Sequence, residues 1–193
     1  MDWFEYLYPL FESASYLGVF TALVLCGMGL PVPEEASFIV AGYLVSIGKA
    51  RLGYMIVTGL AGVLVGDFCL FFLAKNYGET ILRHWPFRAM FSEKLFEKSR
   101  RFFAKHGDNA VFTAGFFAGV RATTFFLSAT LGFRFSKFLF WDFLRVILTC
   151  PISIWAGYKF GPYADEWLGA RFIWILAAIV IVGIVVTFRK ANS

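Results

Sequence analysis

The sequence has few charged residues: only 16% of its 193 residues are Asp, Glu, Lys or Arg, where a soluble domain carries about 25%. This deficit stands beside 59% hydrophobic residues and a mean hydropathy of +0.69, which excludes an ordinary soluble enzyme. Such an apolar chain is also the opposite of a disordered one. The composition therefore predicts an all-α integral membrane protein, and the length suits a single membrane domain over residues 1–193.

Cysteine and histidine are also scarce, with three and two copies. Cys26, Cys69 and Cys150 lie far apart inside apolar stretches, so neither a disulfide framework nor a zinc site is predicted. No Ser/His/Asp triad, Walker loop, HExxH or GxSxG motif occurs. We therefore expect no enzyme activity, no cofactor and no metal. The acidic, aromatic N-terminus lacks the basic start of a signal peptide.

Three long apolar runs are present, at residues 52–74, 138–160 and 172–188. A transmembrane helix needs about 20 apolar residues, so each run predicts one span. Residues 1–16, rich in Trp, Tyr and Phe, predict an interfacial N-terminal segment, because aromatic rings favour that depth.

Two further apolar regions, 17–48 and 110–133, are interrupted. The first contains Pro31, Pro33 and two acids, and the second contains Arg121. The resulting arms are too short to cross a bilayer, and non-helical backbone at membrane depth must be covered by protein or by a watery cavity. We therefore predict two re-entrant helical hairpins.

The two hairpins form a repeat. Leu52 starts a span 17 residues after Glu35, and Phe138 starts one 17 residues after Arg121. The fold predicted is two inverted repeats, each a re-entrant hairpin followed by a transmembrane helix, with a C-terminal transmembrane helix added. Inverted repeats of this kind place a substrate site near the bilayer midplane.

Basic residues are concentrated between the repeats. Residues 75–108 hold eight of the eighteen Lys and Arg residues against four acids. Basic loops stay cytoplasmic, so this segment and the C-terminus are predicted to be cytoplasmic in a multi-pass inner-membrane protein. The basic amphipathic cytoplasmic segment is assigned to 76–108, and within it residues 87–103 predict an amphipathic helix, either on an anionic leaflet or packed on the protein. The charges match no nucleic-acid-binding module, so we expect no nucleic-acid partner.

Four ionisable residues fall inside apolar regions: Glu34, Glu35, Asp67 and Arg121. A charge at a helix centre costs about 2.5–3.5 kcal/mol on insertion scales, so such residues usually pair or bind a substrate. We predict that these four bind substrate or protons. Glu35 is alternatively a cap on the following helix. Asp142 and Arg145 lie nearer a span end, where a long side chain can reach the interface.

Arg121 is the most informative of the four. It comes two residues after Gly119 at the tip of the second hairpin. Its guanidinium stays charged and binds phosphate through a planar fork, which indicates headgroup recognition. The alternative is a structural ion pair with Glu35 or Asp67. Gly62 and Gly66, just before Asp67, predict close helix packing.

The chain resembles the DedA family, also called the SNARE-associated or VTT-domain membrane proteins. The motifs that carry the resemblance are GLPVPEE at 29–35, GVLVGD at 62–67, FAKHG at 103–107, FFAGVR at 116–121 and SATLG at 128–132. The resemblance covers about residues 20–160 and implies inverted re-entrant hairpins, lipid movement between leaflets and support of the proton motive force. It assigns Glu35, Asp67 and Arg121 to the family's functional positions.

The chain also departs from the pattern of the family. Cys26 stands where members often have an acid, Gly115 where they typically have an arginine, and Ala118 where a proline is usual. An acid and an arginine are thus missing together, as expected of a pair. Glu34, at a position that is usually small, is interpreted as a substitute for the missing carboxylate.

The function predicted is translocation of a phosphate-bearing lipid, such as a polyprenyl phosphate or a phospholipid, in support of envelope homeostasis. Membrane lipids and protons are the expected partners, and a homo-oligomer is open. Two alternatives remain: a proton-coupled exporter of small cations or drugs, and a non-transporting scaffold for envelope assembly.

Overall fold

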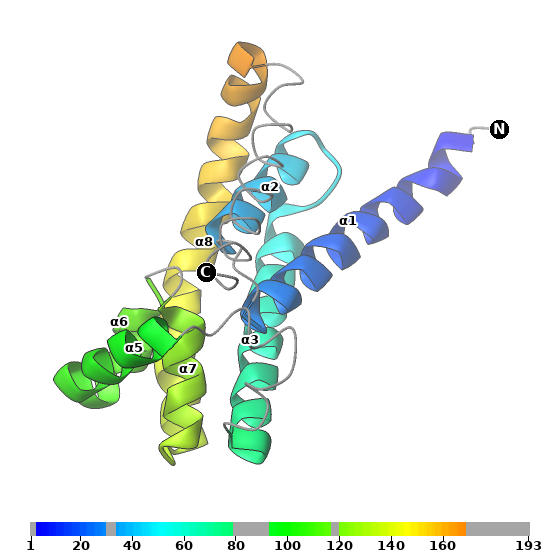
Figure 1. Ribbon diagram of the computed structural model, residues 1–193. Helices are drawn as coiled ribbons and strands as arrows, with labels where there is room; N and C mark the ends of the chain where they lie inside the picture. The colour runs from blue at the N-terminus through cyan, green and yellow to red at the C-terminus, as the bar shows by residue number, and fades with distance from the viewer. Residues whose placement is uncertain (1–2, 30–33, 79–92, 117–119, 169–193) are drawn as a thin grey trace.

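The computed structural model describes residues 3–29, 34–78, 93–116 and 120–168, and every regular element in these ranges is helical (Figure 1). The elements are α1 (Trp3–Gly27), α2 (Glu34–Ser46), α3 (Leu52–Tyr77), α5 (Glu93–His106), the 3-10 turn η2 (Gly107–Asn109), α6 (Ala110–Ala114), α7 (Arg121–Thr130) and α8 (Phe135–Leu168). The all-α prediction is confirmed for these residues.

Within the described residues, two helices are long and apolar enough to cross a membrane, at Leu52–Tyr77 and Phe135–Tyr163. They contain the predicted spans 52–74 and 138–160. Only 39% and 33% of their most apolar windows are buried, whereas the core helix of a soluble protein is mostly covered. Large apolar side chains on their outer faces are exposed, including Tyr54, Val57, Phe72, Phe140, Ile147, Ile152, Trp155 and Phe160. The predicted span 172–188 lies outside the described residues.

The helix α1 runs without a break from Trp3 to Gly27. The predicted boundary between an interfacial segment 1–16 and a hairpin arm therefore does not coincide with a helix end. Residues 12–17 contain neither glycine nor proline, so nothing in the local sequence stops the helix there. Towards its N-terminus α1 extends obliquely away from the other helices (Figure 1).

Glycines bring the backbones of neighbouring helices into contact. A Cβ added at Gly66 of α3 would lie 2.4 Å from the carbonyl oxygen of Val24 in α1. A Cβ at Gly42 of α2 would lie 2.1 Å from the carbonyl oxygen of Ile154 in α8. The pairs α1–α3 and α2–α8 therefore pack at distances that only glycine allows.

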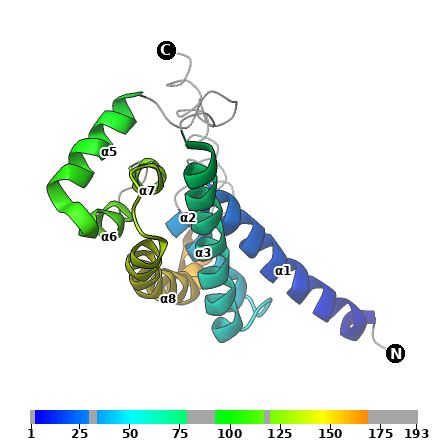
Figure 2. The same ribbon diagram turned by 90° about the horizontal axis from the view of Figure 1, so that it is seen from below.

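Each predicted hairpin region contains the end of one helix and the start of the next. α1 ends at Gly27 and α2 begins at Glu34, while α6 ends at Ala114 and α7 begins at Arg121. Viewed from below, α7 lies between α3 and the pair α5 and α6 (Figure 2). That these pairs re-enter the membrane as an inverted repeat stays a prediction.

Two apolar clusters form the core. The first joins α1, α2, α3 and α8 through residues such as Leu23, Phe38, Val63 and Ile154. The second joins α3, α6, α7 and α8, and its members include Leu70, Phe71, Val111, Phe125, Phe126 and Phe138. Along α3 the first cluster extends to Leu64 and the second begins at Phe68, so a thin layer around Asp67 separates the two clusters.

The contact at Gly66 generates a prediction. Replacing Gly66 with Ala forces α1 away from α3, and overpacking of this kind costs about 1–3 kcal/mol. The midpoint of thermal unfolding in detergent micelles should therefore fall. Gly53→Ala is the matched control in the same helix, because a Cβ at Gly53 meets nothing within 4 Å. Equal midpoints for the two variants would contradict this packing.

Candidate functional site

Five ionisable side chains from four helices meet in the layer between the two apolar clusters. Glu34 is the first residue of α2, Asp67 lies in the middle of α3, and Arg121 is the first residue of α7. Asp142 and Arg145 lie one turn apart on α8. None is more than 8% exposed. We call these five residues the charged cluster.

Arg145 is at the centre of the charged cluster and is fully buried. Its Nη1 donates to Glu34 Oε1, and its Nη2 donates to Asp67 Oδ2 at 3.0 Å. Asp142 Oδ1 accepts from Nη2 at 2.9 Å and from Nε at 3.2 Å. One guanidinium therefore holds carboxylates from three helices.

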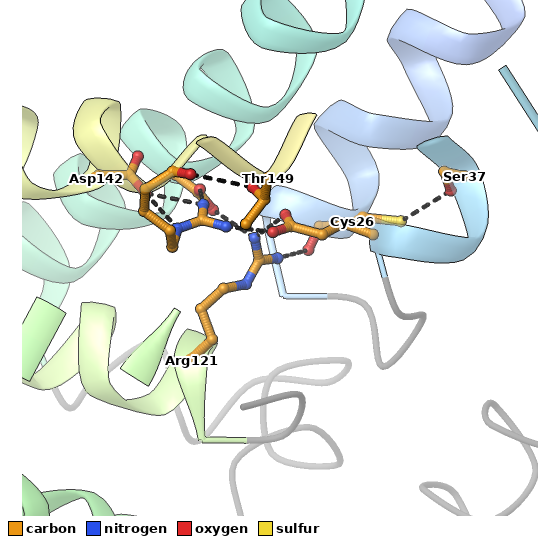
Figure 3. A network of polar contacts seen from close by, with 8 residues as sticks. Cys26, Ser37, Arg121, Asp142 and Thr149 are labelled. Atoms are coloured by element: carbon orange, nitrogen blue, oxygen red, sulfur yellow. Dashed lines mark hydrogen bonds and ion pairs between the residues drawn. The ribbon is translucent and has the colours of Figure 1, made fainter. Parts of the chain in front are cut away.

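Arg121 enters the same network of polar contacts from the start of α7 (Figure 3). Its Nη1 donates to Glu34 Oε2 and lies 3.5 Å from Asp67 Oδ1. Its Nη2 donates to the backbone carbonyl of Cys26, at the end of α1, at 2.9 Å. Arg121 thus connects the start of α7 with the C-terminal end of α1 and with the start of α2.

Glu34 bridges the two arginines, one carboxylate oxygen to each. A carboxylate at a helix N-terminus is favoured by the free N–H groups and the dipole, so the position of Glu34 is intrinsically good. The position of Arg121 is the reverse, because a cation at a helix N-terminus is disfavoured. The acids of the charged cluster offset that cost.

The charged cluster holds three carboxylates and two guanidiniums, so it carries one excess negative charge when every group is ionised. Two of its carboxylate oxygens, Asp67 Oδ1 and Asp142 Oδ2, are buried and accept no hydrogen bond from any described residue. Of these, Asp67 Oδ1 still has Arg121 at ion-pair distance. One additional positive charge would therefore neutralise the charged cluster.

The structure brings together three of the four predicted binding residues: Glu34, Asp67 and Arg121. Glu35 is only half-buried and makes no ion pair among the described residues. The resemblance pointed to Glu35, but neighbouring residues on a helix are rotated by about 100°. Only Glu34 faces both arginines.

The structure describes two of the five predicted packing residues. Gly62 and Gly66 lie against α1, near Phe20 and Val24 respectively. Pro31, Pro33 and Gly119 lie outside the described residues.

Sequence reasoning did not include Asp142 and Arg145 in the site. Long side chains near a span end can reach the interface, which places such residues outside a buried site. In the structure both have no exposed surface, and they form an i,i+3 ion pair. The signal available in the sequence was that spacing, which puts opposite charges on one face of an apolar helix.

This geometry defines a class: a protein that is helical over the described residues, with two candidate membrane spans and opposed charges buried between its helices. The VTT domain matches residues 32–159, more than half of the chain. The chain therefore belongs to the VTT-domain, or DedA, family of membrane proteins, as its motifs suggested.

Three relatives show the range of similarity. An uncharacterized membrane protein of Haemophilus influenzae is 30% identical over 167 residues, 85% of this chain and 78% of that protein. An inner membrane protein of Borreliella burgdorferi is 26% identical over 184 residues, 90% and 87% of the two chains. Undecaprenyl phosphate transporter A of Bacillus subtilis is 24% identical over 135 residues, 70% and 68% of the two chains. No solved structure matches the chain significantly.

The adjacent acids provide a matched test of the charged cluster. Glu34→Gln removes the shared carboxylate and turns an amide donor toward a guanidinium, which should cost about 3–5 kcal/mol of stability, as for other broken buried pairs. Glu35→Gln should change stability by no more than about 0.5 kcal/mol. Unfolding of both variants in detergent micelles measures the difference, and a larger loss for Glu35→Gln would contradict the assignment.

Proposed function

We propose that the protein moves a phosphate-bearing lipid, such as a polyprenyl phosphate or a phospholipid, between membrane leaflets and so supports the cell envelope. The observation that carries the proposal is Arg121: a buried guanidinium at a helix break, among apolar spans. Ionisable residues at such depth usually mark a substrate or ion pathway. The likeness to a relative named as an undecaprenyl phosphate transporter supports the phosphate chemistry.

The two acceptors that Arg121 binds are arranged so that a phosphate group can replace them. Its Nη1 and Nη2 donate to Glu34 and to the Cys26 carbonyl, so the fork is presented with two acceptors side by side. A phosphate offers two oxygens in the same arrangement. In our proposal the headgroup replaces these acceptors, while the apolar tails stay in the lipid alongside the exposed faces of α3 and α8.

A proton is the simplest way to balance this exchange. With three carboxylates and two guanidiniums, one bound proton makes the charged cluster neutral. Protonation of a carboxylate weakens its hold on a guanidinium, which then becomes available to the headgroup. Two other titratable groups, the thiols of Cys26 and Cys150, are also buried nearby.

The proposed topology places residues 75–108 and the C-terminus in the cytoplasm. Among the described residues of α5, Arg100, Arg101 and Lys105 are exposed, which suits contact with a cytoplasmic anionic leaflet.

A second candidate function is proton-coupled export of a small cation. The excess negative charge of the cluster favours it, because a cation would complete the charge balance. The two functions differ in their need for Arg121, which attracts an anion and repels a cation.

Reconstitution in vesicles that contain a fluorescent anionic phospholipid tests the main proposal. The wild-type chain should move the lipid between leaflets, and Arg121→Ala should lower the rate at least about tenfold, equivalent to about 1.4 kcal/mol. Arg134→Ala is the control, because Arg134 is an exposed arginine just before α8. Unchanged lipid movement in Arg121→Ala, or none in the wild type, would contradict the proposal.

The role of the proton has its own test in Asp142→Asn. This isosteric change makes the charged cluster neutral without a proton, and its new N–H₂ group replaces Oδ2, which accepts no hydrogen bond. The rate of lipid movement should then depend less on pH than in the wild type. The same pH profile in both proteins would remove the proton from the mechanism.

A further inference from the structure

The two arginines of the charged cluster are enclosed to different degrees. Arg145 has no exposed surface, and all three of its guanidinium nitrogens donate to carboxylates. Arg121 is 8% exposed. It donates to one carboxylate and one backbone carbonyl. Arg145 therefore has no free donor nitrogen to offer a ligand without breaking a buried ion pair.

Gly115 provides the space for Arg145. A Cβ at Gly115 would lie 1.8 Å from Arg145 Cδ and 2.6 Å from its Nε. The backbone of Gly115 has φ −57° and ψ −27°, an ordinary helical conformation that any residue adopts. Glycine is therefore required here by the side chain of Arg145 and not by the backbone.

Removing Arg121 and removing Arg145 would also leave different sets of ion pairs in the charged cluster. Without Arg121, Glu34 and Asp67 still pair with Arg145. Without Arg145, Asp142 loses its only ion-pair partner among the described residues, and Asp67 keeps only an approach of 3.5 Å to Arg121. The charged cluster therefore keeps more of its ion pairs when Arg121 moves than when Arg145 moves.

From these contacts we infer a division of labour. Arg145, seated on Gly115, is a fixed counter-charge that positions the three carboxylates. Arg121 is the exchangeable guanidinium, which leaves Glu34 to bind the phosphate group of an anionic ligand. The inference deepens the proposed function and rests on it for the role of that ligand in transport.

The test compares Arg121→Gln, Arg145→Gln and Gly115→Ala in the full chain in detergent micelles, with Gly53→Ala as the control for Gly115→Ala. Arg145→Gln and Gly115→Ala should lower the unfolding midpoint clearly more than Arg121→Gln does. Arg145→Lys, which keeps the charge, should recover part of the loss. Equal midpoints for Arg121→Gln and Arg145→Gln would overturn the division.

A second readout separates binding from stability. Short-chain phosphatidylglycerol and inorganic phosphate are each titrated, because a ligand of the folded state raises the midpoint. At least one should stabilise the wild type and Gly115→Ala, whereas Arg121→Gln should bind at least about tenfold more weakly. A shift with both probes means that the phosphate group suffices; a shift with the lipid alone means that the tails are needed. No shift with either probe in the wild type, or an unchanged shift in Arg121→Gln, would overturn the inference.

The outcome also distinguishes this inference from the proposed function. If the wild type moves lipid but the two arginine variants behave alike, the division fails and the function stands. If the wild type moves no lipid but the variants differ as expected, the division stands and the function fails.

Discussion

The structure depends on one constraint: five buried ionisable groups must satisfy one another. A charge taken out of water is tolerated only when it is paired and hydrogen-bonded, and no single helix here carries a complete set. Glu34 and Asp67 come from the first half of the chain, whereas Arg121 and Arg145 come from the second. Without its partner, the first half would bury excess negative charge and the second half would bury excess positive charge. The charged cluster therefore specifies how the two halves of the chain pack together.

The surroundings strengthen these ion pairs. The apolar clusters lie on both sides of the charged layer along α3 and α8, which keeps water away and lowers the local dielectric. The Phe125 ring centroid lies 5.9 Å from the guanidinium carbon of each arginine, so one aromatic ring is within cation–π distance of both cations. Glycine contacts between helices let the short acidic side chains reach across. Packing and electrostatics therefore favour the same arrangement.

Hydropathy was sufficient to predict the two long apolar helices α3 and α8, because apolar length is a local property of the sequence. It was not sufficient to choose between Glu34 and Glu35, since that depends on which side of α2 faces the partner helices. It also failed for Arg145, because a long side chain near a span end can either reach the interface or turn inward. Only the acids of α2 and α3 decide between these directions.

The family resemblance leads one to expect an arginine at position 115, and the structure accounts for the glycine found there. Arg145 from α8 occupies the space that a side chain at 115 would enter, so a guanidinium reaches the acids from a different helix. Cys26 stands where an acid is common, and it contributes its backbone carbonyl to Arg121 instead, while Glu34 supplies a carboxylate close by. What an ion-pair cluster requires is a set of charges at given places, and the helix from which each charge comes is secondary. A family motif can therefore be missing at single positions of a chain that still buries a paired set of acids and arginines.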